Sequence, residues 1–133
     1  MLRLSIKGGE TVNNITFYNR YGKPIAYTDD GKHIYLFSGK PVAYFYDESV
    51  YGFNGKHLGR FIDGWIRDNN GNCVFFTEKT RGSGPIKPIR QIAPIKSIKN
   101  IKPIKSIKQI RPVKPVNTLS WSSLSSEVFF NNQ

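Results

Sequence analysis

The sequence of 133 residues has a single cysteine, Cys73, and only two histidines, His33 and His57. One cysteine excludes an intramolecular disulfide, and so few sulfur and nitrogen ligands argue against a structural zinc site. No stretch approaches the roughly 20 apolar residues of a membrane-spanning helix, and the first ten residues lack the apolar core of a signal peptide. We therefore expect no metal, no cofactor, no transmembrane segment and a cytoplasmic location.

Acidic residues are absent from residues 82–117, which carry nine of the 20 Lys and Arg residues. Residues 1–81 hold eleven Lys and Arg against eight acids, so most of the net charge of +11 lies in the segment that follows them. A basic tail on a near-neutral domain indicates an anionic partner such as nucleic acid, anionic lipid or an acidic protein surface. A tail that only adds solubility is the simpler alternative.

No helical period occurs in residues 1–81, where one phrase is instead repeated four times. Its turn glycines are 17, 16 and 16 residues apart, at Gly22, Gly39, Gly55 and Gly71. A spacing this constant indicates one supersecondary unit used four times. Each glycine is flanked by short β-favouring runs, which is typical of hairpins. The sequence predicts an all-β domain of four pseudo-symmetric hairpins, with about eight short strands closed around a four-fold axis.

The repeats also predict a core. The third residue after each glycine is aliphatic, and the next residue is small in three of the four copies, as a crowded axis requires. The aliphatic positions are Ile25, Val42, Leu58 and Val74, and the small ones are Ala26, Ala43 and Gly59. Before the repeats, the alternation from Leu2 to Lys7 predicts a further strand.

A second repeat follows a flexible Gly82-Ser-Gly84 joint and consists of eleven triplets of the form x-Ile-Lys from Pro85 to Asn117. A period of three matches polyproline II, which keeps each of the three positions in a row of its own. A row of eleven Ile and Val side chains is costly to leave in water. We therefore expect this row to dock on the aromatic face of its own domain, on a neighbouring chain or on a partner.

The chain closes with an apolar element at residues 118–133. The spacing from Trp121 to Val128 predicts a short helix, with Ser120, Ser122 or Ser123 as its cap. We interpret this element as a hydrophobic anchor at the end of a long basic arm.

These phrases carry a family resemblance. The run Gly39-Lys-Pro-Val-Ala-Tyr44, the run Val50-Tyr-Gly-Phe-Asn-Gly-Lys-His-Leu-Gly59 and the closing Trp121-Ser-Ser-Leu-Ser125 resemble bacterial 4-fold beta flower proteins. The resemblance implies the four-hairpin fold and a tail of basic triplets, but it carries no biochemical activity with it. The chain departs from the motif at Arg60, where the motif has a tryptophan.

Candidate binding residues come from both repeats. The aromatic residues are suited to holding a polyproline II segment, and this chain's own tail is one such segment. A role in the core is an equally weighted alternative for them. The candidates are Tyr18, Tyr27, Tyr35, Tyr44, Tyr51, Trp65, Ile95, Ile98, Lys99, Ile101, Lys102, Ile104, Lys105 and Trp121.

Three patterns with catalytic or ligand-binding potential have simpler explanations. His57 and Cys73 hold equivalent positions and suggest a nucleophilic pair, but prolines occupy those positions in the other copies. Recurrent aspartates suggest a carboxylate ring, and recurrent lysines a basic ring. Turn formation and solvated hairpin ends explain them better. The residues are Asp30, Asp47 and Asp63, and Lys23, Lys40 and Lys56.

We therefore expect three parts: a four-hairpin domain at residues 1–81, a linker and polyproline II arm at 82–117, and an anchor at 118–133. The favoured function is a non-enzymatic binding or scaffold module that acts through the Ile-striped arm on its own tail, a second copy or another protein. A protein that binds nucleic acid through its phosphates is the alternative. An enzyme is the third hypothesis.

Overall fold

The computed structural model describes residues 6–7, 10–11 and 14–131. Eight strands form one antiparallel sheet in chain order: β3 (Ile15–Tyr18), β4 (Pro24–Thr28), β5 (His33–Leu36), β6 (Pro41–Tyr46), β7 (Ser49–Tyr51), β8 (His57–Ile62), β9 (Trp65–Asp68) and β10 (Cys73–Phe75). A separate pair consists of β1 (Ile6–Lys7) and β2 (Glu10–Thr11). Of the strand predicted from Leu2 to Lys7, only the last two residues lie within the described part.

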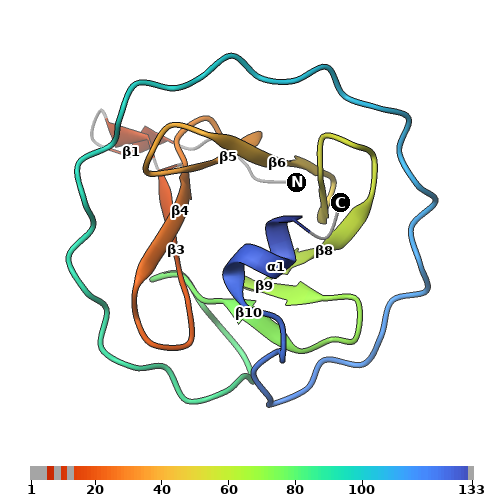
Figure 1. The fold of residues 1–133 in the computed structure, drawn as a ribbon. Helices are drawn as coiled ribbons and strands as arrows, with labels where there is room; N and C mark the ends of the chain where they lie inside the picture. The colour runs from red at the N-terminus through yellow and green to blue at the C-terminus, as the bar shows by residue number, and fades with distance from the viewer. Residues whose placement is uncertain (1–5, 8–9, 12–13, 132–133) are drawn as a thin grey trace.

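The sheet curls until its two edge strands meet. The backbones of Tyr18 and Phe76 exchange two hydrogen bonds of 2.9 Å each, which joins the end of β3 to the residue after β10. The eight strands thus make a nearly closed barrel of four hairpins around a central axis (Figure 1). The all-β, four-hairpin prediction is confirmed.

Turn chemistry fixes the hairpin lengths. The four turn glycines have φ between +80° and +96°, a range that L side chains rarely adopt. Two of the three connections between hairpins place an aspartate at positive φ, with values of 53° at Asp47 and 52° at Asp63, and the first connection has Gly31 at 71°. Asn and Asp tolerate this region better than other non-glycine residues because their short side chains bond locally.

The barrel interior is apolar. Phe17, Ile34, Val50 and Ile66 are fully buried in one cluster, with Phe75 packed edge-on against Phe17. Three of the four predicted aliphatic positions are also buried in this cluster. The fourth, Ile25, is only partly buried and lies at a cavity described below.

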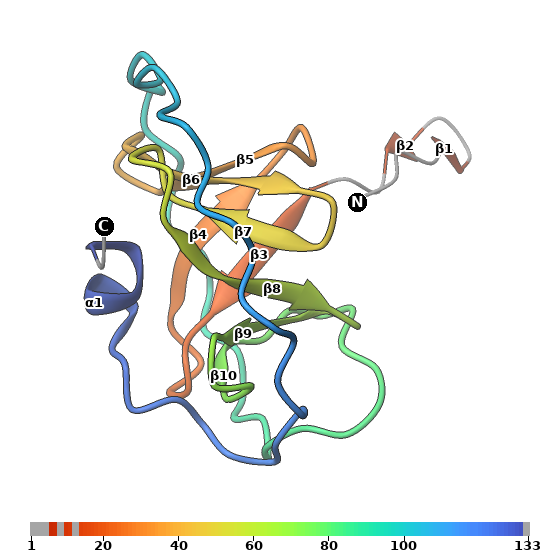
Figure 2. The same ribbon diagram turned by 90° about the vertical axis from the view of Figure 1, so that its right-hand side faces the viewer.

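Residues 85–117, called the arm from here on, contain no helix or strand and run once around the outside of the barrel (Figure 1). The chain then turns inward to a short helix, α1 (Ser126–Asn131), which lies at one end of the barrel (Figure 1 and Figure 2). The helix begins later than predicted, and Ser125 caps it by accepting the N–H of Val128 at 3.1 Å. No helix in the described part of the chain is long and apolar enough to span a membrane.

Candidate binding surface

The outer face of the barrel carries a ring of side-chain pairs at the strand junctions. Tyr27 stacks on Tyr35 with ring centroids 5.9 Å apart, and Tyr44 stacks on Tyr51 at 6.0 Å. The strand partners Tyr18 and Phe76, which close the barrel, repeat this arrangement at 5.4 Å. Each pair joins one hairpin to the next, and all of these rings are buried.

The fourth junction breaks the pattern. Here Arg60 and Arg67 lie directly opposite each other on β8 and β9, where the other junctions have aromatic rings. Both arginines are buried, although like charges opposite each other on a sheet are unfavourable. Their guanidinium groups are held by carbonyls of the arm and of the segments at its ends, as described below.

The arm is fastened to the barrel by backbone hydrogen bonds at regular intervals. The N–H groups of four arm-side residues donate to the carbonyls of the four turn glycines, at 2.7–3.2 Å: Gln91 to Gly22, Asn100 to Gly39, Gln109 to Gly55 and Thr118 to Gly71. Two further bonds run from Ser97 to the carbonyl of Phe37 and from Ser106 to that of Phe53. The donors recur every nine residues, so three triplets of the arm span one hairpin of the barrel.

This period of nine was visible in the sequence but was not predicted. The first triplet of each nine starts with proline, at Pro85, Pro94, Pro103 and Pro112. Proline has no N–H to donate, and no hydrogen bond is needed at those places. The third triplet of each nine starts with a residue that keeps its N–H, and this N–H donates to a glycine carbonyl. These residues are Gln91, Asn100, Gln109 and, just after the last triplet, Thr118.

The arm gives a second reason why the four turn residues are glycines. A Cβ placed on Gly39 would lie 2.1 Å from the carbonyl oxygen of Ile98, and a Cβ on Gly55 would lie 2.0 Å from that of Ile107. Gly22 and Gly71 meet the arm in the same way. These residues are therefore glycine both for their positive φ and because the arm backbone passes where a side chain would start.

The basic side chains of the arm lie over the outer rings. The ammonium group of Lys96 is 4.4 Å from the centre of the Tyr27 ring, and that of Lys105 is 4.4 Å from the Tyr44 ring. Lys99 lies 5.3 Å from the Tyr35 ring and donates to Asp29 at 2.6 Å. Such cation–π contacts contribute about 0.5–1 kcal/mol each at exposed sites. The lysines of the arm thus lie against tyrosine rings that are themselves buried, and a role of these rings in binding stays a prediction.

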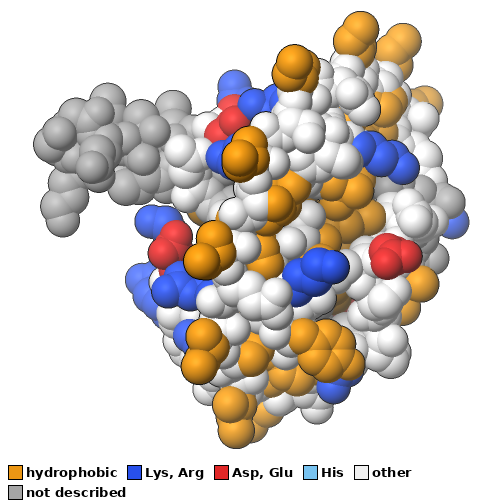
Figure 3. All heavy atoms as spheres, turned by 60° about the vertical axis from the view of Figure 1, so that its left-hand side comes forward, with side chains coloured by type: hydrophobic (Ala, Val, Ile, Leu, Met, Phe, Trp, Pro, Cys, Tyr) orange, Lys and Arg blue, Asp and Glu red, His pale blue; other side chains and the backbone are white. Residues whose placement is uncertain are grey.

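The isoleucines of the arm face the solvent. All eleven Ile and Val side chains at the second triplet position are between 84% and 96% exposed. On the face shown in Figure 3, hydrophobic side chains protrude separately from the molecular surface. The idea that the Ile row docks on the aromatic face of its own domain is therefore wrong: that face is taken by lysine and backbone. The other two options, a neighbouring chain or a partner, stay open.

We call these eleven side chains the Ile ridge. Its members are Ile86, Ile89, Ile92, Ile95, Ile98, Ile101, Ile104, Ile107, Ile110, Val113 and Val116. The candidate residues Ile95, Ile98, Ile101 and Ile104 belong to it. Lys99 and Lys105 lie on the inner side of the arm, whereas Lys102 makes no ring contact or ion pair with any described residue. The polyproline II conformation of the arm stays a prediction.

The two ends of the arm meet at Arg67. Its Nη1 donates to the carbonyls of Gly71 and Thr118, both at 2.7 Å, and its Nη2 donates to that of Ser83 at 2.9 Å. Ser83 precedes the arm and Thr118 follows it, so one guanidinium group binds both ends. Arg60 adds a bond of 2.6 Å to the carbonyl of Pro112. The departure from the family motif at Arg60 thus belongs to the closure of the arm.

The two tryptophans lie in one cluster next to this closure. Trp65 is buried, and its Nε1 donates to the carbonyl of Arg81. Trp121 packs edge-on against Trp65, and its backbone pairs with Cys73. Beyond it, Phe129 and Phe130 of α1 pack against Phe75 of the core, so the closing element is part of the barrel's own packing.

His57 and Cys73 do not form a nucleophilic pair. The ring nitrogens of His57 bond to Asn69 Oδ1 at 2.8 Å and Ser49 Oγ at 2.9 Å. Burial lowers the pKa of His57 and raises the pKa of the Cys73 thiol to about 11, so this thiol stays protonated near neutral pH. A protonated, buried thiol is a poor nucleophile.

The recurrent aspartates lie in the turns between hairpins and stabilise their conformation. Asp30 Oδ1 accepts the N–H groups of Lys32 and His33, and Asp30 Oδ2 lies 2.7 Å from the His33 ring. Burial raises the pKa of Asp30, but these hydrogen bonds outweigh it and lower the value to about 2. Asp47 and Asp63 take the positive-φ positions already described. Within the described ranges, no three His, Cys, Asp or Glu side chains gather closely enough to hold a metal ion.

Comparison with known proteins gives one result. The family model described as "4-fold beta flower protein" matches residues 15–130, which covers the barrel, the arm and nearly all of α1. Searches against curated proteins and against solved structures give no match. The fold, the repeats and this match agree, and the chain belongs to the 4-fold beta flower protein family.

Proposed function

We propose that this protein is a non-enzymatic binding module whose Ile ridge contacts an apolar surface of a partner protein. The observation that carries the proposal is the exposure of the ridge, since all eleven side chains are at least 84% exposed on an arm that is itself fastened down. Burying one such side chain contributes roughly 1.5–3 kcal/mol. A few such side chains acting together are enough for stable association.

The fastening of the arm supports this function. An unattached tail loses backbone freedom when it binds, and that loss opposes association. Here the hydrogen bonds to the glycine carbonyls and the lysine contacts fix the arm before any partner arrives. The nine-residue period also offers about four similar segments around the barrel, which favours a multivalent partner or several copies of one partner.

The alternative, an anionic polymer, is less well supported. Six of the nine basic residues of the arm lie over aromatic rings of the barrel, and Lys114 pairs with Glu48 at 3.2 Å. These charges already serve the attachment of the arm. Binding to phosphates would compete with that attachment.

A pull-down with matched variants tests the proposal. The full chain is immobilised and exposed to an extract of its native cells, and recovered proteins are quantified by mass spectrometry. The test variant replaces Ile95, Ile98, Ile101 and Ile104 with serine, and the control is Lys102→Gln. We expect at least one protein whose recovery falls tenfold or more with the serine variant and persists with the control, including in 0.5 M NaCl.

Two outcomes contradict the proposal. Equal recovery of every protein by the wild type and the serine variant would show that the ridge makes no contact. Recovery of nucleic acid alone, lost at 0.5 M NaCl, would favour the anionic-polymer alternative. Sedimentation of the same variants separates self-association from capture of another protein.

A further inference from the structure

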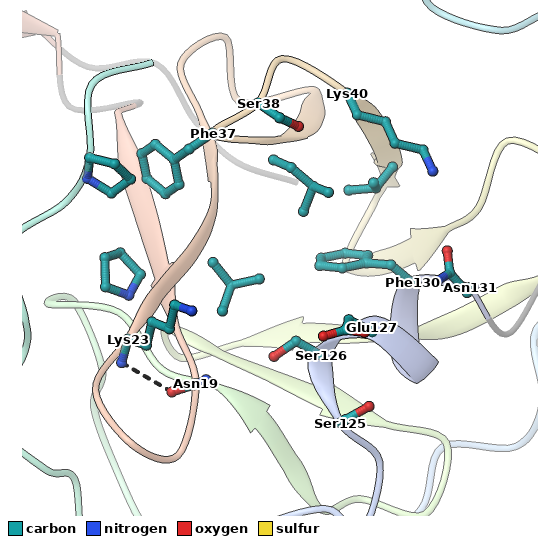
Figure 4. A pocket seen from close by; sticks show the side chains of 15 residues that line it. Asn19, Lys23, Phe37, Ser38, Lys40, Ser125, Ser126, Glu127, Phe130 and Asn131 are labelled. Atoms are coloured by element: carbon teal, nitrogen blue, oxygen red, sulfur yellow. Dashed lines mark hydrogen bonds between the residues drawn. The ribbon is translucent and has the colours of Figure 1, made fainter. Parts of the chain in front are cut away.

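A cavity of about 490 Å³ opens at the end of the barrel beside α1 (Figure 4). Its wall is mainly apolar and includes Ile25, Leu36, Val42 and Phe130. The volume lies in the range of sites that bind small molecules, which are apolar pockets with a few polar groups at defined places. This cavity is separate from the Ile ridge, although Pro94 of the arm forms part of its rim.

The position of α1 explains why the cavity exists. The helix packs off-centre, with Phe130 stacked on Phe75 at 5.3 Å next to β10. The equivalent aliphatic residues Val42, Leu58 and Val74 are buried, while Ile25 and Leu36 are only partly buried. Side chains that belong to the core pattern thus face an open space.

Two lysines flank this space. Lys23 and Lys40 hold equivalent positions in the first two hairpins, directly after the turn glycines, and both line the cavity (Figure 4). Neither forms an ion pair with a described residue, in contrast to Lys99 and Lys114 of the arm. Glu127 of α1 also lines the cavity and carries the opposite charge.

We infer that the cavity binds a small amphipathic molecule with an apolar body and one anionic group. The apolar body lies against Ile25, Leu36 and Phe130, and the anionic group lies at the edge of the cavity, beside Lys23 or beside Lys40 on the other side (Figure 4). Burial of the body supplies the affinity, and the lysines favour an acid over a neutral molecule of the same length. Glu127 opposes the anion and sets a limit to that preference.

Calorimetric titration of the full chain with decanoate tests the inference, with decanol as the neutral probe. We expect saturable one-to-one binding of decanoate that is at least fivefold tighter than binding of decanol. Ile25→Trp fills the cavity and should weaken decanoate binding at least tenfold. Lys23→Gln combined with Lys40→Gln should weaken it at least fivefold, and Glu127→Gln should tighten it.

Matched controls keep the result specific. Lys56→Gln alters the equivalent lysine of the third hairpin, which does not line this cavity, and should leave binding unchanged. The variant with four serines in the Ile ridge should also bind normally, so that failure of this inference and failure of the proposed function are separable. Absence of saturable binding, equal affinity for decanol, or normal binding by Ile25→Trp in a folded protein would overturn the inference.

Discussion

The barrel and the arm use isoleucine in opposite ways. Ile34 and Ile66 of the barrel are fully buried, whereas Ile98 and Ile101 of the arm are 91% and 96% exposed. The barrel is held together by apolar burial, as in most small domains. The arm is held by backbone hydrogen bonds to glycine carbonyls and by lysines lying on tyrosine rings. Isoleucines of the barrel therefore stabilise the fold, whereas isoleucines of the arm form the outer surface.

The largest effect should come from the glycines that the arm crosses. Gly39→Ala introduces a Cβ where the Ile98 carbonyl lies, at a residue with φ of +96°. The strained φ and the displaced arm together should lower the free energy of unfolding by about 3 kcal/mol or more. Urea denaturation measures this loss, and trypsin cleavage at the arm lysines should accelerate in parallel.

Gly82→Ala is the matched control for that substitution. Gly82 also has a positive φ, of +72°, but the nearest atom to an added Cβ is Asp63 Oδ2 at 3.8 Å. The Gly82→Ala variant should therefore lose only about 1 kcal/mol or a little more of its free energy of unfolding, from backbone strain alone. Equal losses at Gly39 and Gly82 would mean that contact with the arm contributes nothing.

Alkaline pH should weaken the barrel and the arm together. Burial raises the pKa of Cys73 to about 11 and also raises the pKa values of Tyr27, Tyr44 and Tyr51. The unfolded chain releases these protons at lower pH than the folded protein. The contribution of these groups to the free energy of unfolding is therefore fully present below about pH 9 and falls as pH rises toward 11. For Cys73 alone the loss is on the order of 2–3 kcal/mol.

The measurement is urea denaturation between pH 8 and pH 11. A Cys73→Ser variant should lose less stability over this interval than the wild type, because serine does not titrate. A flat profile in the wild type would contradict the burial of these groups.

A smaller loss should follow removal of one hydrogen bond of the arm. Asn100→Pro removes the N–H that donates to Gly39, and it should lower the free energy of unfolding by about 1–2 kcal/mol. Lys102→Pro is the control, because no hydrogen bond from the N–H of Lys102 is found in the described structure. Hydrogen exchange at the neighbouring Ser97 amide should rise in the first variant alone, and an equal rise in both would show that the period of nine has no role in attachment.

The smallest loss should follow neutralisation of the lysines. Lys96→Gln and Lys105→Gln each remove a cation 4.4 Å from a tyrosine ring and should cost about 0.5–1 kcal/mol apiece. Lys102→Gln, with no ring contact, should cost nothing measurable. Thermal denaturation resolves the difference, and a loss with Lys102→Gln as large as with Lys96→Gln would argue against the ring contacts.

The barrel was predictable because its signals are local. A glycine every 16 or 17 residues defines a hairpin, and four equal hairpins have few ways to bury their apolar faces other than closure. The core positions followed from the same alignment, with the exception of Ile25. That exception depends on where α1 docks, and no local pattern in the sequence reports the position of a helix across a barrel.

The orientation of the arm was not predictable from its period of three. A conformation with three residues per turn keeps the three triplet positions in separate rows, but it does not say which row faces the barrel. Hydrophobicity favours placing the Ile row inward, and the structure places it outward. The decisive signal was the period of nine formed by the prolines and the donor residues. It becomes meaningful only beside the spacing of the turn glycines, because it matches three triplets to one hairpin. The binding of both ends of the arm by Arg67 had no signal in the sequence other than the departure from the family motif at Arg60.

The central claim is that the arm is attached without the Ile ridge. Urea denaturation of the variant with serine at Ile95, Ile98, Ile101 and Ile104 tests it most directly. The account predicts a free energy of unfolding within about 0.5 kcal/mol of the wild type, since these side chains are exposed in the folded protein. A loss of several kcal/mol, as expected for buried isoleucine, would contradict it.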